Sequence, residues 1–494
     1  MTGQQHSTTV GALPSTGTES PGAVPTALTR FVWALFVASL GLLGARAAGV
    51  TWTLPNPLTV DGLTLLMWTV ATFFSGIVHS YSRRYMAGSA HVERFFTRLF
   101  AFTLLVMTLV AADHVALFAM AWLGMGLVMA DLIGVVEGWP QAQAAAALAR
   151  RYFVASGALL GGVLALLAWA TGATTVSGIG AAASTLSTPV WAIAVSGLLL
   201  VAMVQSALLP FHGWLLSSMT APTPASALMH AGFVNAGGIL LLRFAPLVTL
   251  DATFMQIVVL VGAVSALGGK LLKTVQTDVK RQLGCSTVGQ MGFMIMQAGL
   301  GFFGAAITHL VLHGFFKAYQ FLSSGEALDR TSPGKAESES TDATGAVVTA
   351  LTAVAGGAVF VALTGKGTHF GTGLLLVGLV VLSTLHAARA VVGRTAVPAA
   401  VRFGAGPLVF LLAIAGYGLA YRAIEGVLAD LPVVTAAADL TVVHGVVALA
   451  FGAAYLAIER GVYERSDRLY VALLNATQPE SETLLTSREE YNEY

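Results

Sequence analysis

Cysteine is the rarest residue in this sequence: Cys285 is the single example among 494 residues. One thiol cannot form a disulfide within the chain, nor can it supply the several thiolates of a structural zinc or iron-sulfur site. The scarcity therefore excludes both a disulfide framework and a thiolate metal centre inside this chain.

Charge is scarce as well. Only 10% of the residues are charged and the formal net charge is +1, so no basic surface for nucleic acid is indicated. Hydrophobic residues make up 56% and the mean hydropathy is +0.78. A soluble core of this size could not absorb so much apolar surface. We therefore predict an all-α polytopic membrane protein.

Apolar runs divide the chain into three regions. Residues 1–28 hold no Lys or Arg and predict a disordered cytoplasmic tail rather than a signal peptide. Residues 29–459 predict a transmembrane bundle, and 460–494 a cytoplasmic C-terminal segment that binds a partner, because 468–475 (RLYVALLN) is apolar. We expect about 14 spans, near 29–50, 61–80, 95–111, 114–136, 152–171, 189–210, 223–247, 254–272, 284–300, 303–323, 344–365, 371–391, 405–425 and 440–459.

Basic residues gather in alternate loops between these spans. They include the pairs at 83–84 and 150–151 and the loop at 270–281, whereas the opposite loops hold few. Because cytoplasmic loops of membrane proteins are enriched in Lys and Arg, this bias predicts that both termini are cytoplasmic.

Three ionisable residues stand out in the apolar stretch 305–326. His309, His313 and Lys317 are four residues apart and therefore lie along one face of a helix. Lys317 is about 4.5 Å from the midpoint of the span, too deep for its side chain to reach the interface. Ionisable groups at such depth usually face a bundle interior or a wet cavity, and they mark functional sites.

Two other interpretations of this row stay open. The histidines could form half of a metal site, although zinc requires three or four ligands and no further ligand is adjacent in sequence. They could also be packing histidines beside a structural lysine. A proton or cation relay is the interpretation that we favour.

Further polar residues lie in other spans. His230 and Asn235 follow the segment 210–224 (PFHGWLLSSMTAPTP), whose prolines predict irregular backbone at or near the membrane surface. His230 is either an interhelical contact or a relay member. Asp131, near the cytoplasmic end of its span, is either an interfacial cap or a proton acceptor.

Four segments carry a family resemblance: 60–67 (VDGLTLLM), 208–238, 277–294 (TDVKRQLGCSTVGQMGFM) and 307–325 (ITHLVLHGFFKAYQFLSSG). They resemble the antiporter-like, proton-conducting subunits of respiratory complex I and Mrp antiporters, the NADH-quinone oxidoreductase subunit 5 family. The resemblance implies two inverted five-helix repeats, each with one broken helix. It also implies a central hydrophilic axis, made by His230, His309, His313 and Lys317 and fed by Lys280.

Two departures from this family concern the first repeat. Leu123 follows Trp122 where relatives usually carry a glutamate, and Gln205 stands before Ser206 where they usually carry a lysine. Losing both partners avoids an unpaired buried charge, which would cost about 3–5 kcal/mol. Asp131, two turns from Leu123, is a candidate replacement for the acid. The expected ion-translocation residues are His309, His313, Lys317, His230, Lys280, Asp131, Asn235 and Gln205.

Residues 468–479 (RLYVALLNATQP) indicate one group of proteins within this family. They are similar to the C-terminal segment of the membrane subunits of DAB inorganic-carbon accumulation complexes. This implies a bacterial inner-membrane subunit, itself not an enzyme and without cofactor or metal. It would conduct H⁺, or Na⁺, down its gradient and so energise CO2 hydration by a large, zinc-binding, carbonic-anhydrase-like DabA-type partner on the cytoplasmic face.

Two alternatives to this function stay open. One is a subunit of a redox-driven proton pump or of a multi-subunit Na⁺/H⁺ antiporter. The other is a scaffold that has lost conduction and only holds its partner at the membrane.

Overall fold

A computed structural model describes residues 22–52, 56–324, 343–394, 397–479 and 483. Within these ranges the regular structure is helical, and only isolated bridges connect extended residues. The helices are α1 Ala23–Ala47, α2 Gly62–Tyr85, α3 Val92–Ala111, α4 Val115–Ile133, α5 Pro140–Thr171, α6 Val176–Ala181, α7 Thr188–Gln205, α8 Gly213–Ser217, α9 Thr223–Ala231, α10 Ala236–Arg243, α11 Ala245–Val248, α12 Ala252–Thr274, α13 Val279–Gly299, α14 Phe303–Leu322, α15 Ala343–Thr364, α16 Thr372–Val392, α17 Gly406–Val427, α18 Val442–Glu459 and α19 Asp467–Ala476.

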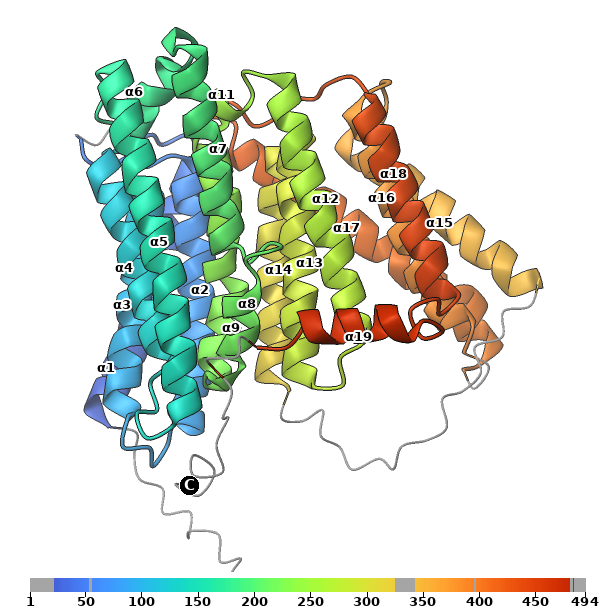
Figure 1. Ribbon diagram of the computed structural model, residues 1–494, viewed down its shortest axis with the longest axis horizontal. Helices are drawn as coiled ribbons and strands as arrows, with labels where there is room; N and C mark the ends of the chain where they lie inside the picture. The colour runs from blue at the N-terminus through green and yellow to red at the C-terminus, as the bar shows by residue number, and fades with distance from the viewer. Residues whose placement is uncertain (1–21, 53–55, 325–342, 395–396, 480–482, 484–494) are drawn as a thin grey trace, which may run out of the picture.

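The long helices agree with a polytopic membrane protein. Among the described residues, twelve helical stretches are long and apolar enough to cross a membrane. The helices α13 and α14, of 21 and 20 residues, have the length but carry more polar side chains. Because these two lie among the other long helices, they complete a bundle close to the expected 14 spans (Figure 1).

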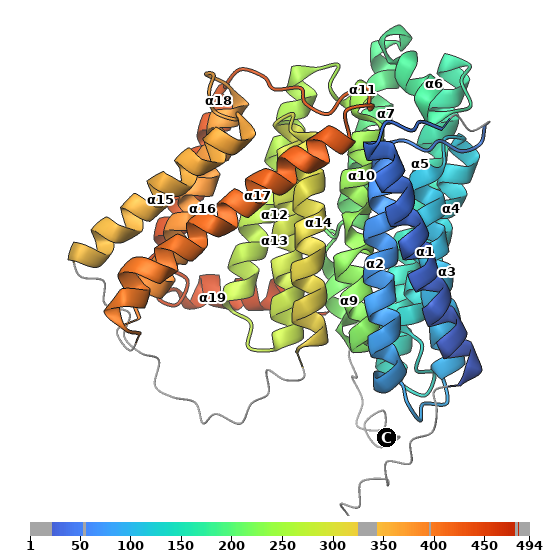
Figure 2. The ribbon, with the colours of Figure 1, turned by 180° about the vertical axis from the view of Figure 1, so that it is seen from behind.

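Two groups of helices make up the bundle. The helices α1 to α11 form a compact cluster, and α12, α13 and α14 run alongside it (Figures 1 and 2). The helices α15, α16 and α18 stand tilted on the far side of α12 to α14, and α17 runs obliquely across α12 to α14, in contact with α14 and α2. The short helix α19 crosses one end of the bundle, which we call the α19 end, and packs against α12.

Several boundaries differ from the sequence prediction. The first helix begins at Ala23, so residues 23–28 are helical and only 1–21 of the expected tail lie outside the described residues. The helix α5 begins twelve residues before the expected span at 152, because Pro140 is well suited to the first turn of a helix. Of the expected C-terminal segment 460–494, residues 480–482 and 484–494 lie outside the described residues.

The expected irregular backbone at 210–224 is partly helical. It contains the short helix α8 and a 3₁₀ turn at Ser218–Thr220. The interruption inside the next span lies further along, at a 3₁₀ turn formed by Phe233–Asn235 between α9 and α10. The helix α16 is one continuous helix.

An ion pair connects the start of α2 to the end of α10, at the end of the bundle opposite α19. Asp61 caps the N-terminus of α2 and pairs with Arg243 at the end of α10. Arg243 also donates to Thr64 Oγ1 at 2.9 Å and to the Val110 carbonyl at 2.6 Å. Burial opposes ionisation of Asp61, but Arg243 and Thr64 hold the pKa of its carboxyl below its usual value.

Replacing Asp61 by asparagine is expected to lower the free energy of unfolding by about 3 kcal/mol, because it leaves a nearly buried arginine without its counter-charge. The Arg243 side chain is only 7% exposed. The matched control is Arg94→Gln, which breaks a surface pair with Glu137 whose side chains are 44% and 58% exposed. We expect the control to cost under about 1 kcal/mol. Thermal unfolding in detergent measures both, and equal shifts would contradict the prediction.

Candidate ion-translocation site

The helix α14 places His309, His313 and Lys317 in one row, as the spacing predicts. Lys317 is fully buried and His313 is 4% exposed, whereas His309 is partly exposed to a cavity. The rings of His309 and His313 are nearly parallel, with centroids 5.8 Å apart. The row is therefore continuous and faces protein.

Gly314 brings this face of α14 close to its neighbours. A Cβ atom at this position would lie 2.6 Å from the Phe74 ring and 3.0 Å from the Ala231 carbonyl. Only glycine fits such a close approach without displacement. The helix α14 therefore packs tightly against α2 and against the end of α9, just before the break in that helix.

The polar helix α13 supplies the partners of the row. Lys317 Nζ donates to the Leu283 carbonyl at 2.9 Å, and His313 Nδ1 hydrogen-bonds Gln290 Oε1. A carboxamide oxygen only accepts, so it can accept from His313 when the ring carries its hydrogen on Nδ1. Its Nε2 is then the atom that can accept a proton.

His230 joins the same site from α9. Its Nδ1 lies 2.9 Å from the Thr287 hydroxyl of α13, and its ring stacks on Phe321 of α14 at 4.4 Å. The structure thus brings together His230, His309, His313 and Lys317, the four residues expected for the axis, around α13 and α14.

Three imidazole nitrogens at this site are buried without a protein partner among the described residues: Nε2 of His230, of His309 and of His313. Buried polar atoms in native proteins are almost always hydrogen-bonded, and an unsatisfied one costs about 1–3 kcal/mol. Such atoms suit transient binding of a proton or of water.

The other predicted residues lie outside this row. Lys280 is in the first turn of α13, where its Nζ donates to the Ala221 carbonyl at 3.3 Å. Asn235 stands at the helix break and donates to the Ala231 carbonyl at 2.7 Å. Gln205 ends α7, and both of its amide atoms are buried without a partner in the described part of the chain.

Asp131 has basic partners near the end of α4. Its carboxylate lies 2.5 Å from Arg150 and 3.5 Å from Arg98, and its side chain is 34% exposed. This setting is that of an interfacial ion pair. It favours the capping interpretation of Asp131 over a replacement for the acid missing at Leu123.

Thr287 and Gln290 are site residues that were not predicted from the sequence. Both lie in the segment 277–294 that carries the family resemblance, and they are one turn apart on α13. Two polar residues one turn apart in a membrane-spanning helix share a face, and this pattern could have identified Thr287 and Gln290 from the sequence. Concerning the metal alternative, no group of three or more His, Cys, Asp or Glu side chains able to hold an ion occurs in the described ranges.

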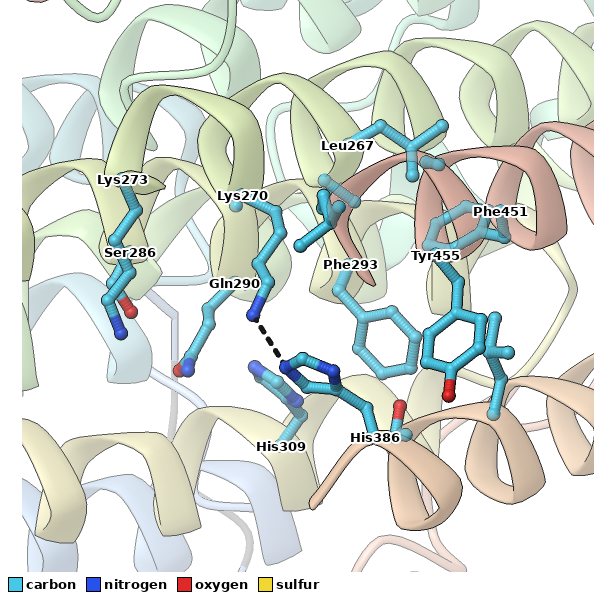
Figure 3. A pocket seen from close by; sticks show the side chains of 16 residues that line it. Leu267, Lys270, Lys273, Ser286, Gln290, Phe293, His309, His386, Phe451 and Tyr455 are labelled. Carbon is cyan, nitrogen blue, oxygen red and sulfur yellow. Dashed lines mark hydrogen bonds between the residues drawn. The ribbon is translucent and has the colours of Figure 1, made fainter. Parts of the chain in front are cut away.

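A cavity of about 430 Å³ adjoins the row on the side of α16 and α18 (Figure 3). His309 and Gln290 line one part of it, and Lys270 and His386 line another. His386 was not among the predicted site residues, although it is a histidine within the expected span 371–391.

Two family profiles and a solved structure match this chain. The profile described as "NADH:quinone oxidoreductase/Mrp antiporter, TM" matches residues 112–394, and that of the complex I chain 5 N-terminus matches residues 50–96. A solved structure of the Mrp complex from Dietzia sp. has a TM-score of 0.54 at 21% identity, covering 95% of this chain and 54% of that one. At this identity the likeness shows the fold alone.

Curated relatives share sequence over the same region. A probable inorganic carbon transporter subunit DabB1 of Halothiobacillus neapolitanus is 39% identical over 57% of this chain and 51% of its own length. A probable DabB of Bacillus subtilis is 36% identical over 65% and 64%, and an NADH-quinone oxidoreductase subunit L of Mycobacterium tuberculosis is 37% identical over 55% and 43%. The matches thus span about half the length of such relatives. Because the transmembrane profile covers more than half of its 494 residues, the chain belongs to the NADH:quinone oxidoreductase/Mrp antiporter transmembrane family.

Proposed function

We propose that this chain is the membrane subunit of an inorganic-carbon uptake complex of the bacterial inner membrane. It conducts H⁺ down its gradient along the row of α14 and so energises CO2 hydration by a carbonic-anhydrase-like, zinc-binding partner on the cytoplasmic face. The observation that carries conduction is the fully buried Lys317 beside His313, with partners on α13.

The row suits proton transfer because its groups exchange protons without moving far. An imidazole accepts a proton at one nitrogen and releases one from the other, and an amine alternates between ammonium and amine. His313 holds its Nδ1 hydrogen toward Gln290 and leaves Nε2 for an incoming proton. Each transfer biases the next site by charge repulsion, which gives the row its direction under a gradient.

Sodium is the weaker candidate for the conducted ion. Hard cations prefer several oxygen ligands, especially carboxylates. The row presents ring nitrogens and an amine, and the Gln290 oxygen is already bonded to His313. The chemistry of the donors therefore favours H⁺.

The inorganic-carbon role rests on the relatives and on the α19 end. Relatives from Halothiobacillus neapolitanus and Bacillus subtilis are named probable inorganic carbon transporter subunits. The helix α19 presents Leu469, Tyr470 and Val471, which are 38%, 38% and 51% exposed, on the face that we assign to the cytoplasm. This apolar surface supports a partner at the α19 end. The positive charge of the loops at that end supports cytoplasmic termini.

Copurification and an uncoupler test this proposal together. The tagged chain is purified from membranes, and we expect a zinc-containing protein of carbonic-anhydrase type to accompany it. Bicarbonate accumulation by cells that carry the pair is expected to stop when a protonophore collapses the gradient. Several small hydrophobic subunits in place of the zinc protein would instead identify a redox pump or antiporter subunit. Accumulation that persists with the protonophore would identify a scaffold without conduction.

A further inference from the structure

The mouth of this mostly apolar cavity carries a hydrogen-bonded chain of ionisable side chains from three helices. Lys270 Nζ of α12 lies 3.2 Å from His386 Nε2 of α16 (Figure 3). His386 Nδ1 lies 2.8 Å from Glu459 Oε1 at the end of α18, and Arg389 Nε lies 3.1 Å from the other carboxylate oxygen. These four residues, which we call the Lys270–Glu459 chain, gather near the α19 end.

This chain lies between solvent and the cavity. The His386 side chain is 40% exposed and that of Arg389 44%, whereas Glu459 is 16% exposed. Lys270 is exposed as well, and Lys270 and His386 both point into the cavity, which is open, so the chain lies at the mouth of the cavity (Figure 3).

The same cavity reaches the conduction row. Gln290 and His309 line it, and Gln290 is the hydrogen-bond partner of His313. His309 contributes an Nε2 atom that lacks a protein partner among the described residues. The cavity thus joins the Lys270–Glu459 chain to the row within the second half of the protein.

We infer that the Lys270–Glu459 chain is the port through which the row exchanges protons with the cytoplasm, and that His386 carries each proton across it. The inference rests on the proposed conduction and adds the residues of its cytoplasmic end.

The transfer balances in protons and charge. The Lys270 ammonium gives a proton to His386 Nε2 as the proton on Nδ1 passes to Glu459. One N–H bond breaks at Nζ and one forms at Nε2, while one N–H bond breaks at Nδ1 and one O–H bond forms on the carboxylate. Glu459 then releases the proton to water, and rotation of the ring resets the tautomer. Arg389 keeps its own charge throughout, since its guanidinium does not titrate in this range, and it stabilises the anionic carboxylate.

The alternative is a purely structural role, in which the same contacts only hold α12, α16 and α18 together. The two roles differ in what they require of His386. Pinning needs only a donor toward Glu459 and an acceptor toward Lys270, both of which a glutamine supplies, whereas proton transfer needs a group that titrates.

The test measures proton flux into vesicles that contain the full purified complex. His386→Gln is expected to lower the flux about tenfold or more, the scale on which a lost proton-transfer group acts, without changing assembly. His386→Ala is expected to lose flux and to regain it when imidazole, small enough for the cavity, is added. Full proton flux in the His386→Gln variant would contradict the inference that His386 carries protons.

A second comparison separates this inference from the proposed function. If the unchanged complex conducts no protons, the proposed function fails, and the port fails with it. If the unchanged complex conducts and His386→Ala is neither slowed nor sensitive to imidazole, the port alone is wrong. An Arg389→Gln variant, which keeps a donor near Glu459 but removes the fixed charge, is expected to slow the flux less than His386→Gln.

Discussion

Replacing Lys317 by methionine is expected to reduce proton flux to that of vesicles without the complex. Methionine keeps most of the volume of the side chain but has no group that binds a proton. Lys317 is fully buried, and its ammonium donates to the Leu283 carbonyl. Because a buried ionic group replaced by an apolar one of similar size often leaves stability unchanged or improved, folding and assembly should survive. Loss of flux without loss of stability is the expected signature.

A second variant at Lys317 separates charge from titration. Lys317→Arg keeps a positive charge and hydrogen-bond donors, but a guanidinium does not release its proton at accessible pH. We expect it to be as inactive as the methionine variant, with assembly checked by copurification and thermal unfolding. Full flux in either variant would show that protons do not pass through Lys317.

Replacing His313 by asparagine is expected to have the second-largest effect. The Asn amide can keep the hydrogen bond from the Nδ1 position to Gln290, but it cannot take up a proton at the Nε2 position. Flux should therefore fall to near background although the contact to α13 is kept. The measurement is the same vesicle assay, with thermal unfolding as the check on folding.

His79 offers a matched control for His313. It is fully buried in α2, with Nδ1 2.8 Å from the Ser75 carbonyl and its ring against Phe96, outside the row. His79→Asn is expected to disturb packing and lower the unfolding temperature, while flux per assembled complex stays near the unchanged value. Equal loss of flux in both variants would mean that His313 acts through packing rather than by proton transfer.

The departures in the first repeat increase the importance of these two residues. At Leu123, where the family resemblance leads us to expect an acid, the side chain packs near Gly157 of α5. Gln205, where the resemblance leads us to expect a lysine, is buried and uncharged. Asp131 is paired with arginines at a helix end. We therefore expect conduction to depend on the second repeat more strongly than in a relative with charged pairs in both.

Hydropathy and spacing by themselves determined the membrane class and the row. A bilayer requires about 20 apolar residues per span, so the spans can be read along the chain. His309, His313 and Lys317 share a face because a helix fixes the direction of residues four apart. Both properties are local, and neither depends on which helices become neighbours.

Tertiary structure alone decided the rest of the site. The break at Phe233–Asn235 lies beyond the prolines that suggested it, and the Ala231 carbonyl just before the break lies beside Gly314 of α14. Lys270, His386 and Glu459 come from helices far apart in sequence, and each alone resembles an ordinary charge near a helix end. Their hydrogen-bonded chain exists only because α12, α16 and α18 converge, and no pattern along the sequence encodes which helices pack together.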